Sequence, residues 1–324
     1  MKKDIVEKNC LICKSPCKIF QKNIFDDRYG APGKYSIYKC SDCGYGRIKP
    51  LIDQEKIGKF YSEYYPLNLK TAEQVKKEAN IKPKWLAWLM GTNNTAHWLI
   101  KPKSTVLDIG SASGISLMEI KKMGGDAYGV EPNPSAQKIA KKLGLHVYEG
   151  FITDNLFPKQ EFDFITASQV LEHDPNPKTF LEAIRKKLKK NGIAILSFPN
   201  CDSIYRKIFK KKWINWHVPY HCNFFTKTSF IKITKFTGYK VLKMQTVTPN
   251  IWTILQVRRL FAKPEEGKKD AIWKVHNKSL GGVTIIILKL LRNIIMVVLI
   301  PINRLIDLFG QGDSFIVVLE KKYE

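Results

Sequence analysis

The stretch Val106-Leu107-Asp108-Ile109-Gly110-Ser111-Ala112-Ser113-Gly114 decides the fold of this chain. Its mainly apolar first half is typical of a buried strand, and the small residues that follow are typical of a loop that opens a helix. Gly110 and Gly114 let the backbone approach a ligand closely. A second acid, Glu131, ends the next apolar run. An acid about 20 residues after such a loop suits the two hydroxyls of a ribose.

Strand and helix patterns alternate on both sides of this loop. We expect strands at 105–109, 127–130, 162–167 and 193–198, and helices at 115–123, 135–143 and 177–190. The helix at 177–190 is expected to stop at Asn191-Gly192 in the left-handed conformation. The alternation predicts an α/β fold, a Rossmann-like doubly wound sheet that is mostly parallel.

Two C-x-x-C pairs precede this sheet, and their members are Cys10, Cys13, Cys40 and Cys43. Two residues between thiolates let both sulfurs reach one tetrahedral zinc ion at about 2.3 Å. We predict a structural Zn²⁺ in a zinc ribbon over residues 1–60. Cys17 could replace one ligand, although its spacing is poorer, and free or redox-active thiols are the alternative. Chelation is expected to unfold this segment and to leave the later domain folded.

The charge of the chain favours anionic partners. Lysine and arginine number 54 against 29 acids, which gives a net charge of +25. Nucleic acid, anionic lipid and phosphorylated metabolites all suit that charge, and a lysine-rich genome is a simpler explanation. A hydrophobic fraction of 44% excludes a wholly disordered chain. The N-terminus has no apolar core after its basic start, so we expect a cytoplasmic protein.

Residues 281–309 combine long apolar runs with a polar stripe. At about 100° per residue, the polar side chains fall within roughly 60° of one direction. They are Lys289, Arg292, Asn293, Asn303, Arg304 and Asp307. The pattern predicts an amphipathic helix or helix pair. It could pack on the core or on a second subunit, lie in the plane of a membrane at its inner face, or span the membrane. The two internal cations argue against a span.

The stretch Asp108–Gly114 resembles a motif of the class I S-adenosylmethionine-dependent methyltransferases. Their first motif is usually D-x-G-x-G-x-G, and Ala112 stands here in place of the commonest glycine. Residues 170–175 resemble the "LEH-x-x-P" stretch common in the family, and 312–318 resemble its last, antiparallel strand. The resemblance covers about 104–239 and the end of the chain. It implies S-adenosylmethionine as cofactor and methyl transfer as the activity.

The resemblance also implies which residues hold the cofactor and how the chain is divided. The expected cofactor-binding residues are Asp108, Gly110, Ser111, Gly114, Glu131 and Gln169. Asp108 and the glycine loop would hold the amino-acid part, and Glu131 would hold the ribose. The expected divisions are a zinc ribbon at 1–60, a partly helical connector at 61–103, a methyltransferase domain at 104–248 plus 310–324, and a helical, apolar insertion at 249–309.

A subset of the family shares three further features with this chain: a zinc ribbon, a tyrosine-rich connector and a stretch like Trp216–Thr226. Members of that subset resemble enzymes of surface-polysaccharide and glycan biosynthesis. The resemblance implies a small-molecule or glycan acceptor, methylated at a hydroxyl, and a lipid-linked glycan is one form of it.

The alternative function is an RNA methyltransferase, in which the basic stretch 206–213 would meet phosphates and stack a base. The absence of an Asn-Pro-Pro-Tyr motif argues against it. A non-catalytic binding module is a third reading. The sequence does not identify the acceptor or the methylated atom, and it does not decide whether the chain forms a homodimer.

Methyl transfer to a hydroxyl needs a group that removes the acceptor proton, and histidine suits that task. His173 and His221 each follow a predicted strand at the edge where ligands bind in open α/β sheets. We expect His221 to be the base, with His173 or no side chain as the alternatives. The Glu172-His173 pair is similar to ubiquinone-type O-methyltransferases, in which two glutamates and a histidine hold a cation. Gln169 stands at the position of their first glutamate, which argues against a metal there.

Overall fold

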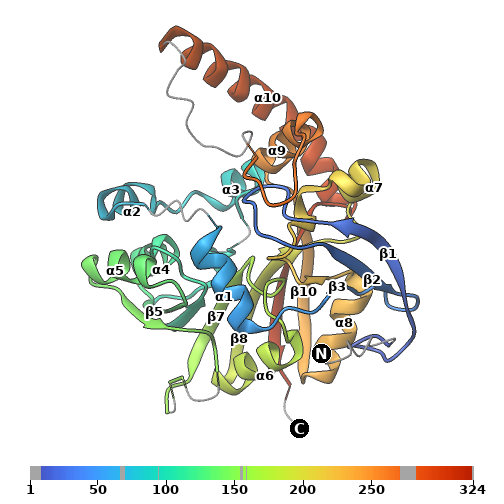
Figure 1. The fold of residues 1–324 in the computed structure, drawn as a ribbon. Coiled ribbons are helices and arrows are strands. Elements are labelled where there is room, and N and C mark those ends of the chain that lie inside the picture. The colour runs from blue at the N-terminus through green and yellow to red at the C-terminus, as the bar shows by residue number, and fades with distance from the viewer. Residues whose placement is uncertain are drawn as a thin grey trace.

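A seven-stranded sheet forms the centre of the computed structural model (Figure 1). The described residues are 9–65, 70–93, 95–153, 156–157, 159–270 and 282–322, and within 282–292 only the backbone is described. The strand order is β10-β11-β8-β7-β4-β5-β6. In chain order the strands are β4 (Thr105–Ile109), β5 (Asp126–Glu131), β6 (His146–Glu149), β7 (Phe162–Ser168), β8 (Leu188–Pro199), β10 (Tyr239–Val247) and β11 (Ser314–Lys321).

The direction of the strands confirms the predicted fold class. The pairs from β6 to β8 are parallel, and β11 is antiparallel to both of its neighbours. The helices that flank the sheet are α4 (Ile115–Lys122), α5 (Pro134–Lys142), α6 (Pro177–Lys187) and α8 (Lys227–Phe236). Successive residues of β4 face opposite sides. Val106 packs in a core with α4 and α5 residues, and Leu107 and Ile109 pack in a core with α6 and α8 residues.

The predicted helix at 177–190 is wrong at its end. α6 ends at Lys187, and Leu188 already pairs with Phe162 of β7. The reason is burial: Leu188 is fully buried, so the chain enters the sheet there. Asn191 does adopt a left-handed conformation with φ 63°, but it does so inside β8, near an irregularity in the β7–β8 register. The left-handed residue therefore marks a bulge and not a helix stop.

The zinc-ribbon segment forms a second sheet that includes a strand from much later in the chain. Its strands are β1 (Cys17–Ile24), β2 (Tyr35–Cys40), β3 (Gly46–Lys49) and β9 (Asn223–Phe224). Side chains add to the β3–β9 pairing: the Tyr45 hydroxyl donates to Asn223 Oδ1 at 2.5 Å, and Thr226 Oγ1 donates to the Cys43 carbonyl at 2.7 Å. Residues 9–60 are thus joined to the loop that follows β8.

The connector and the insertion are helical. The connector holds α1 (Gln54–Glu63), α2 (Ala72–Glu78) and α3 (Lys84–Met90), and α3 ends at Gly91 in the left-handed conformation. The insertion holds α9 (Asn250–Phe261) and α10 (Gly282–Leu308), and α10 projects from the top of the molecule (Figure 1). Gly281 lies outside the described residues. Among the described helices, none combines the length and the apolar character needed to cross a membrane.

Candidate functional site

A pocket of about 460 Å³ opens at the carboxyl ends of β4, β5 and β7. This is the edge at which open α/β sheets bind ligands. The predicted residues Gly110, Glu131, Gln169 and His173 line it. One further wall comes from α1, which lies in front of the sheet in Figure 1.

Two positions in the loop after β4 accept no residue other than glycine. Gly110 has φ +74°, and a Cβ there would lie 2.7 Å from Val170 Cγ2. Gly114 has φ +92°, and a Cβ there would lie 2.5 Å from Leu145 Cδ1. Both positions combine a left-handed backbone with a steric clash for any side chain. The loop therefore stays close to its neighbours and leaves the space above it to a ligand.

Glu131 ties this loop to the end of β5. Its carboxylate accepts from the Ala112 amide at 2.9 Å and from the Asn133 amide at 2.8 Å. Burial raises the pKa of Glu131, and the two amides act against that rise. Each oxygen keeps a further lone pair, so the side chain can still accept from two hydroxyls of a ligand.

The other predicted cofactor residues lie around the pocket in different ways. Asp108 is buried and accepts from Thr166 Oγ1 at 2.6 Å, and burial raises its pKa. Asp108, Ser111 and Gly114 belong to β4 and its loop but are not among the residues that line the pocket. Gln169 does line it, with φ 57°, and its amide donates to Ser314 Oγ at 3.0 Å.

The structure brings His173 and His221 together with Glu172. The two rings lie edge to face with centroids 4.6 Å apart. Nε2 of His173 is 3.9 Å from Glu172 Oε1, and Nε2 of His221 is 4.0 Å from the same oxygen. His173 lines the pocket, whereas His221 is buried behind it and does not. Although they come from loops almost 50 residues apart, the two candidates form one cluster.

The hydrogen bonds of the two rings fix their tautomers. Nδ1 of His173 lies 3.0 Å from the Tyr220 carbonyl, and Nδ1 of His221 lies 2.8 Å from the Asn215 carbonyl. A carbonyl can only accept, so each Nδ1 carries a proton and each neutral ring has its lone pair on Nε2. Burial lowers the pKa of His173 to about 4 and that of His221 well below its usual value.

Glu172 is the unusual member of this cluster. It is almost fully buried, and neither carboxylate oxygen has a hydrogen-bond partner. Burial raises its pKa to about 8. Glu172, His173 and His221 each offer a ligand atom within 4.8 Å of the others, a spacing that a metal ion could also use. The sequence placed both histidines at one edge of the sheet and paired Glu172 with His173, but it did not predict that His221 would lie beside Glu172.

Aromatic side chains from the connector complete the pocket wall. Tyr61 of α1 and the following Tyr65 line it. The Tyr61 hydroxyl is 2.7 Å from His173 Nδ1, and both tyrosine rings pack against Tyr220. The tyrosine-rich connector is evident in the sequence, but none of its residues was predicted to belong to the site. Its aromatic composition was the available signal.

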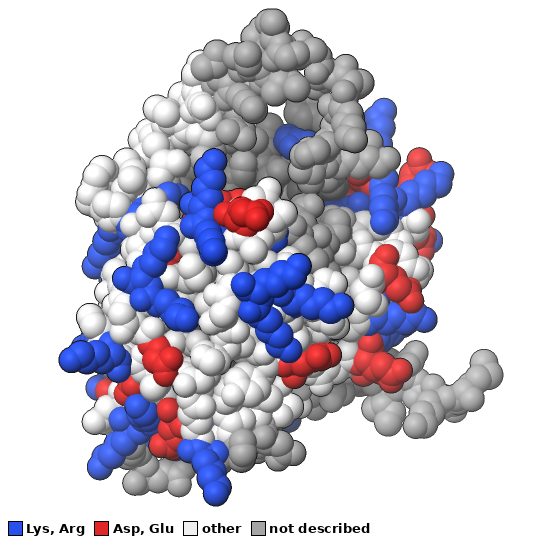
Figure 2. Space-filling view, turned by 90° about the vertical axis from the view of Figure 1, so that its left-hand side faces the viewer, with Lys and Arg blue, Asp and Glu red and all other residues white. Residues whose placement is uncertain are grey.

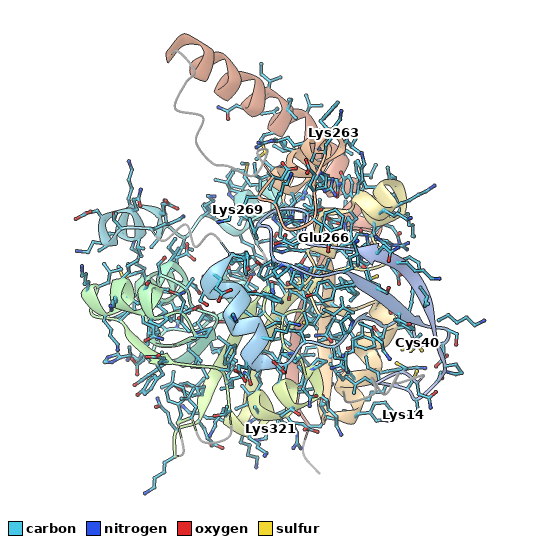
Figure 3. All side chains as sticks on the ribbon, viewed as in Figure 1. Lys14, Cys40, Lys263, Glu266, Lys269 and Lys321 are labelled. Atoms are coloured by element: carbon cyan, nitrogen blue, oxygen red, sulfur yellow. The ribbon has the colours of Figure 1, made fainter. Side chains whose placement is uncertain are left out.

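The four predicted zinc ligands converge at the end of the ribbon. Sulfur–sulfur distances are 3.7 Å for Cys10–Cys43, 3.4 Å for Cys13–Cys40 and 3.5 Å for Cys13–Cys43. A tetrahedron with zinc–sulfur bonds of about 2.3 Å has edges near 3.8 Å, so the sulfurs fit one zinc ion. Cys17 is not a member of this group. Figure 3 shows Cys40 at the lower right, away from Lys263 and Lys269 near α9.

The basic stretch 206–213 does not expose an aromatic ring on which a base could stack at Trp213. Trp213 is fully buried, and its indole donates to Asp313 Oδ1 at 2.7 Å. Arg206 donates to the Cys201 carbonyl at 2.8 Å. The expectation that Trp213 could stack a base is therefore wrong, because its ring lies inside the core. Figure 2 shows the other side of the molecule, away from α7, and there lysines and arginines lie among acidic and neutral residues.

Comparison with known proteins identifies the central region. A family model described as a methyltransferase domain matches residues 84–244. An uncharacterised protein of Methanocaldococcus jannaschii, MJ1123, is 30% identical over 142 residues, which are 44% of this chain and 67% of that protein.

Two similar proteins have names that state an activity. The mitochondrial ubiquinone biosynthesis O-methyltransferase of Schizosaccharomyces pombe is 32% identical over 101 residues, 28% of this chain and 36% of the relative. The match therefore spans about a third of that enzyme. Among solved structures, the [4+2]-cyclase SpnF superposes with a TM-score of 0.52 at 14% identity, over 85% of this chain and 99% of that one. This likeness concerns the fold alone.

Proposed function

The chain belongs to the class I S-adenosylmethionine-dependent methyltransferases, and on that premise we propose that it methylates a hydroxyl of a small-molecule or glycan acceptor. The observation that carries this proposal is the place of His173, a neutral histidine in the wall of the pocket beside the glycine loop. Similarity to ubiquinone biosynthesis O-methyltransferases supports a hydroxyl as the methylated group.

The pocket suits the cofactor that the family uses. Glu131 would accept from the ribose hydroxyls, and the loop with Gly110 would leave room for the amino-acid part. Gln169, on the opposite rim, would contact the same ligand. Bound S-adenosylmethionine supplies a methyl group on a sulfonium, a leaving group that is already activated.

The task left to this chain is to position the acceptor and to remove its proton. As the acceptor oxygen forms its bond to the methyl carbon, Nε2 of His173 takes the hydroxyl proton. Its low pKa keeps that nitrogen unprotonated at neutral pH. The Tyr220 carbonyl and the Tyr61 hydroxyl hold the other side of the ring. His221 packs edge to face against His173 and is assigned to position it, and Glu172 Oε1 lies about 4 Å from the Nε2 atom of each ring.

The wall formed by Tyr61 and Tyr65 supports an acceptor with a ring and polar edges, because tyrosine offers an apolar face and a hydroxyl. A sugar of a surface glycan has that character. The resemblance to glycan-modifying methyltransferases points to the same class, and a lipid-linked glycan would accord with a peripheral membrane contact through 281–309. RNA remains the alternative acceptor, and the burial of Trp213 weakens it.

The test is to follow the methyl group of labelled S-adenosylmethionine into isolated glycan, lipid-linked glycan and RNA fractions. Label in an O-methyl group of a glycan fraction, lost in His173→Ala, is the expected result. Label in RNA alone would overturn the glycan acceptor. Label in an N-methyl group would overturn the hydroxyl.

A further inference from the structure

The two helices between β10 and β11 turn their polar sides inward. The buried polar residues are Asn250, Thr253, Gln256 and Arg259 of α9, and Asn303, Arg304 and Asp307 of α10. The four in α9 recur every third residue and so form one stripe. A surface helix of a globular protein normally buries its apolar stripe. In this pair of helices the arrangement is reversed.

The inward polar stripes bond to each other and to the core. Asn303 Nδ2 donates to Asn250 Oδ1 at 2.9 Å, which joins α10 to α9. Arg304 pairs with Asp307 at 2.8 Å, and Asp307 accepts from the Thr248 amide at 2.9 Å. Unpaired polar groups would be costly at such depth. These bonds therefore fix which side of each helix faces inward.

The outward side is apolar. We define the apolar ridge as the exposed residues Ile251, Val257, Leu260 and Phe261 of α9 and Ile294, Ile295, Val297, Val298, Ile302, Leu305, Leu308 and Phe309 in and just after α10. Val297 is 65% exposed and Leu308 72%. The α10 part spans an arc of roughly 160° and a length of about 24 Å. Within 294–309, whose side chains are all described, no charged residue is exposed.

Lysines border the apolar ridge. Lys207, Lys210, Lys211 and Lys212 are exposed at the end of α7 (Ile204–Phe209) and just after it. Lys212 Nζ donates to the Leu260 carbonyl of α9 at 2.9 Å, which places this run beside the ridge. No acid occurs between Ser203 and Trp216. In Figure 1, α7 lies next to α9 and α10.

We propose that the apolar ridge inserts into the headgroup–acyl boundary of an anionic lipid bilayer, with Lys207–Lys212 against the headgroups. Amphipathic helices that lie in a membrane surface have an apolar face and a basic border. A second copy of this chain fits less well, because the lysines that border the ridge have no acid beside them in 203–216 and so offer no complementary charge to the same border of a copy. The proposal adds a membrane partner to the proposed function. Membrane binding itself does not depend on the methyltransferase activity, and only the lipid-linked acceptor rests on that proposed function.

The test is flotation of the full chain with vesicles of phosphatidylcholine alone and with added phosphatidylglycerol. We expect flotation that requires the anionic lipid. The double variant Val297→Glu and Leu305→Glu should reduce vesicle binding at least tenfold. Phe236→Glu, at a 65% exposed position of α8 outside the ridge, is the matched control and should float like the unaltered chain. Replacing Lys207, Lys210 and Lys211 with glutamine should cost roughly fivefold per lysine.

Three outcomes would overturn the proposal. One is no flotation of the unaltered chain with anionic vesicles. Another is equal flotation of the Val297→Glu and Leu305→Glu variant. The third is a stable dimer, seen by sedimentation, that the same variant disperses without any vesicle binding. Calorimetric binding of S-adenosylmethionine needs no vesicle, so failure of the methyltransferase proposal would be seen separately.

Discussion

The pocket edge and the α9–α10 pair use polar residues in opposite ways. At the pocket, polar groups such as Glu131 and His173 stand at the rim of an apolar core and face a cavity. In the helix pair, polar groups such as Asn303 and Asp307 are buried, and apolar side chains face outward. An amphipathic pattern therefore gives the stripes of a helix but not which stripe faces the core.

Loss of zinc should have the largest effect, and it should reach the loop after β8. Structural zinc contributes about 10–16 kcal/mol to folding in small zinc domains. The ribbon shares its sheet with β9, and Thr226 donates to the Cys43 carbonyl. Chelation should therefore raise hydrogen exchange in the ribbon and at 223–226. Arg259 of α9 pairs with Asp27 of the ribbon segment at 2.5 Å, so exchange at that end of α9 should rise as well. Exchange in α5, whose residues pack in a different core, should stay unchanged and serves as the internal control.

This expectation replaces the simpler one that only the ribbon would unfold. Unchanged exchange at 223–226 after complete removal of zinc would show that the two sheets are energetically separate.

His173→Ala should abolish the chemistry of the pocket without affecting the helix pair. Removal of a general base typically lowers kcat by roughly 10²–10⁴. Affinity for S-adenosylmethionine and flotation with vesicles should be retained. For the unaltered chain, the depressed pKa of about 4 keeps the base unprotonated, so kcat/KM should show no acid limb between pH 6 and 8. Near-normal turnover of His173→Ala with the true acceptor would remove it as the base, and a large loss in His221→Ala alone would transfer the role.

Glu131→Ala should weaken cofactor binding by roughly 10- to 100-fold, because hydrogen bonds to a charged group are each worth about 1.5–3 kcal/mol. Glu149 pairs with Glu131 across the β5–β6 register but is exposed, which makes Glu149→Ala the matched control. Calorimetry measures both. Equal affinities in the two variants would exclude Glu131 from the ribose site.

Replacing one buried polar residue and one exposed apolar residue of α10 should show directly that its polar side faces inward. Asn303→Ala leaves the buried Asn250 amide and the Tyr205 hydroxyl without their partner, so it should cost about 1–3 kcal/mol of unfolding free energy. Leu305→Ser, at an exposed position two residues on, should change it by less than about 0.5 kcal/mol. Denaturant unfolding separates them, and the opposite order would mean that the apolar stripe faces inward.

Sequence reasoning succeeded where the relevant residues are close in the chain. The Asp108–Gly114 loop, the β4 strand and the C-x-x-C pairs each carry their own signal, and the fold class followed from their order. It failed at the end of α6, because the burial of Leu188 against β7 outweighed the Asn-Gly signal. It could not find the cluster of Glu172 and His221 or the wall from Tyr61, because these contacts join segments far apart in the chain.

Calorimetric titration of S-adenosylmethionine is the most direct test of the central claim that the pocket beside Gly110 is a methyl-donor site. The account predicts one site per chain in the unaltered protein and loss of binding in Gly110→Val, whose side chain would meet Val170. Phe236→Glu should bind normally. No binding to the folded, unaltered chain, or equal binding by Gly110→Val, would contradict the account.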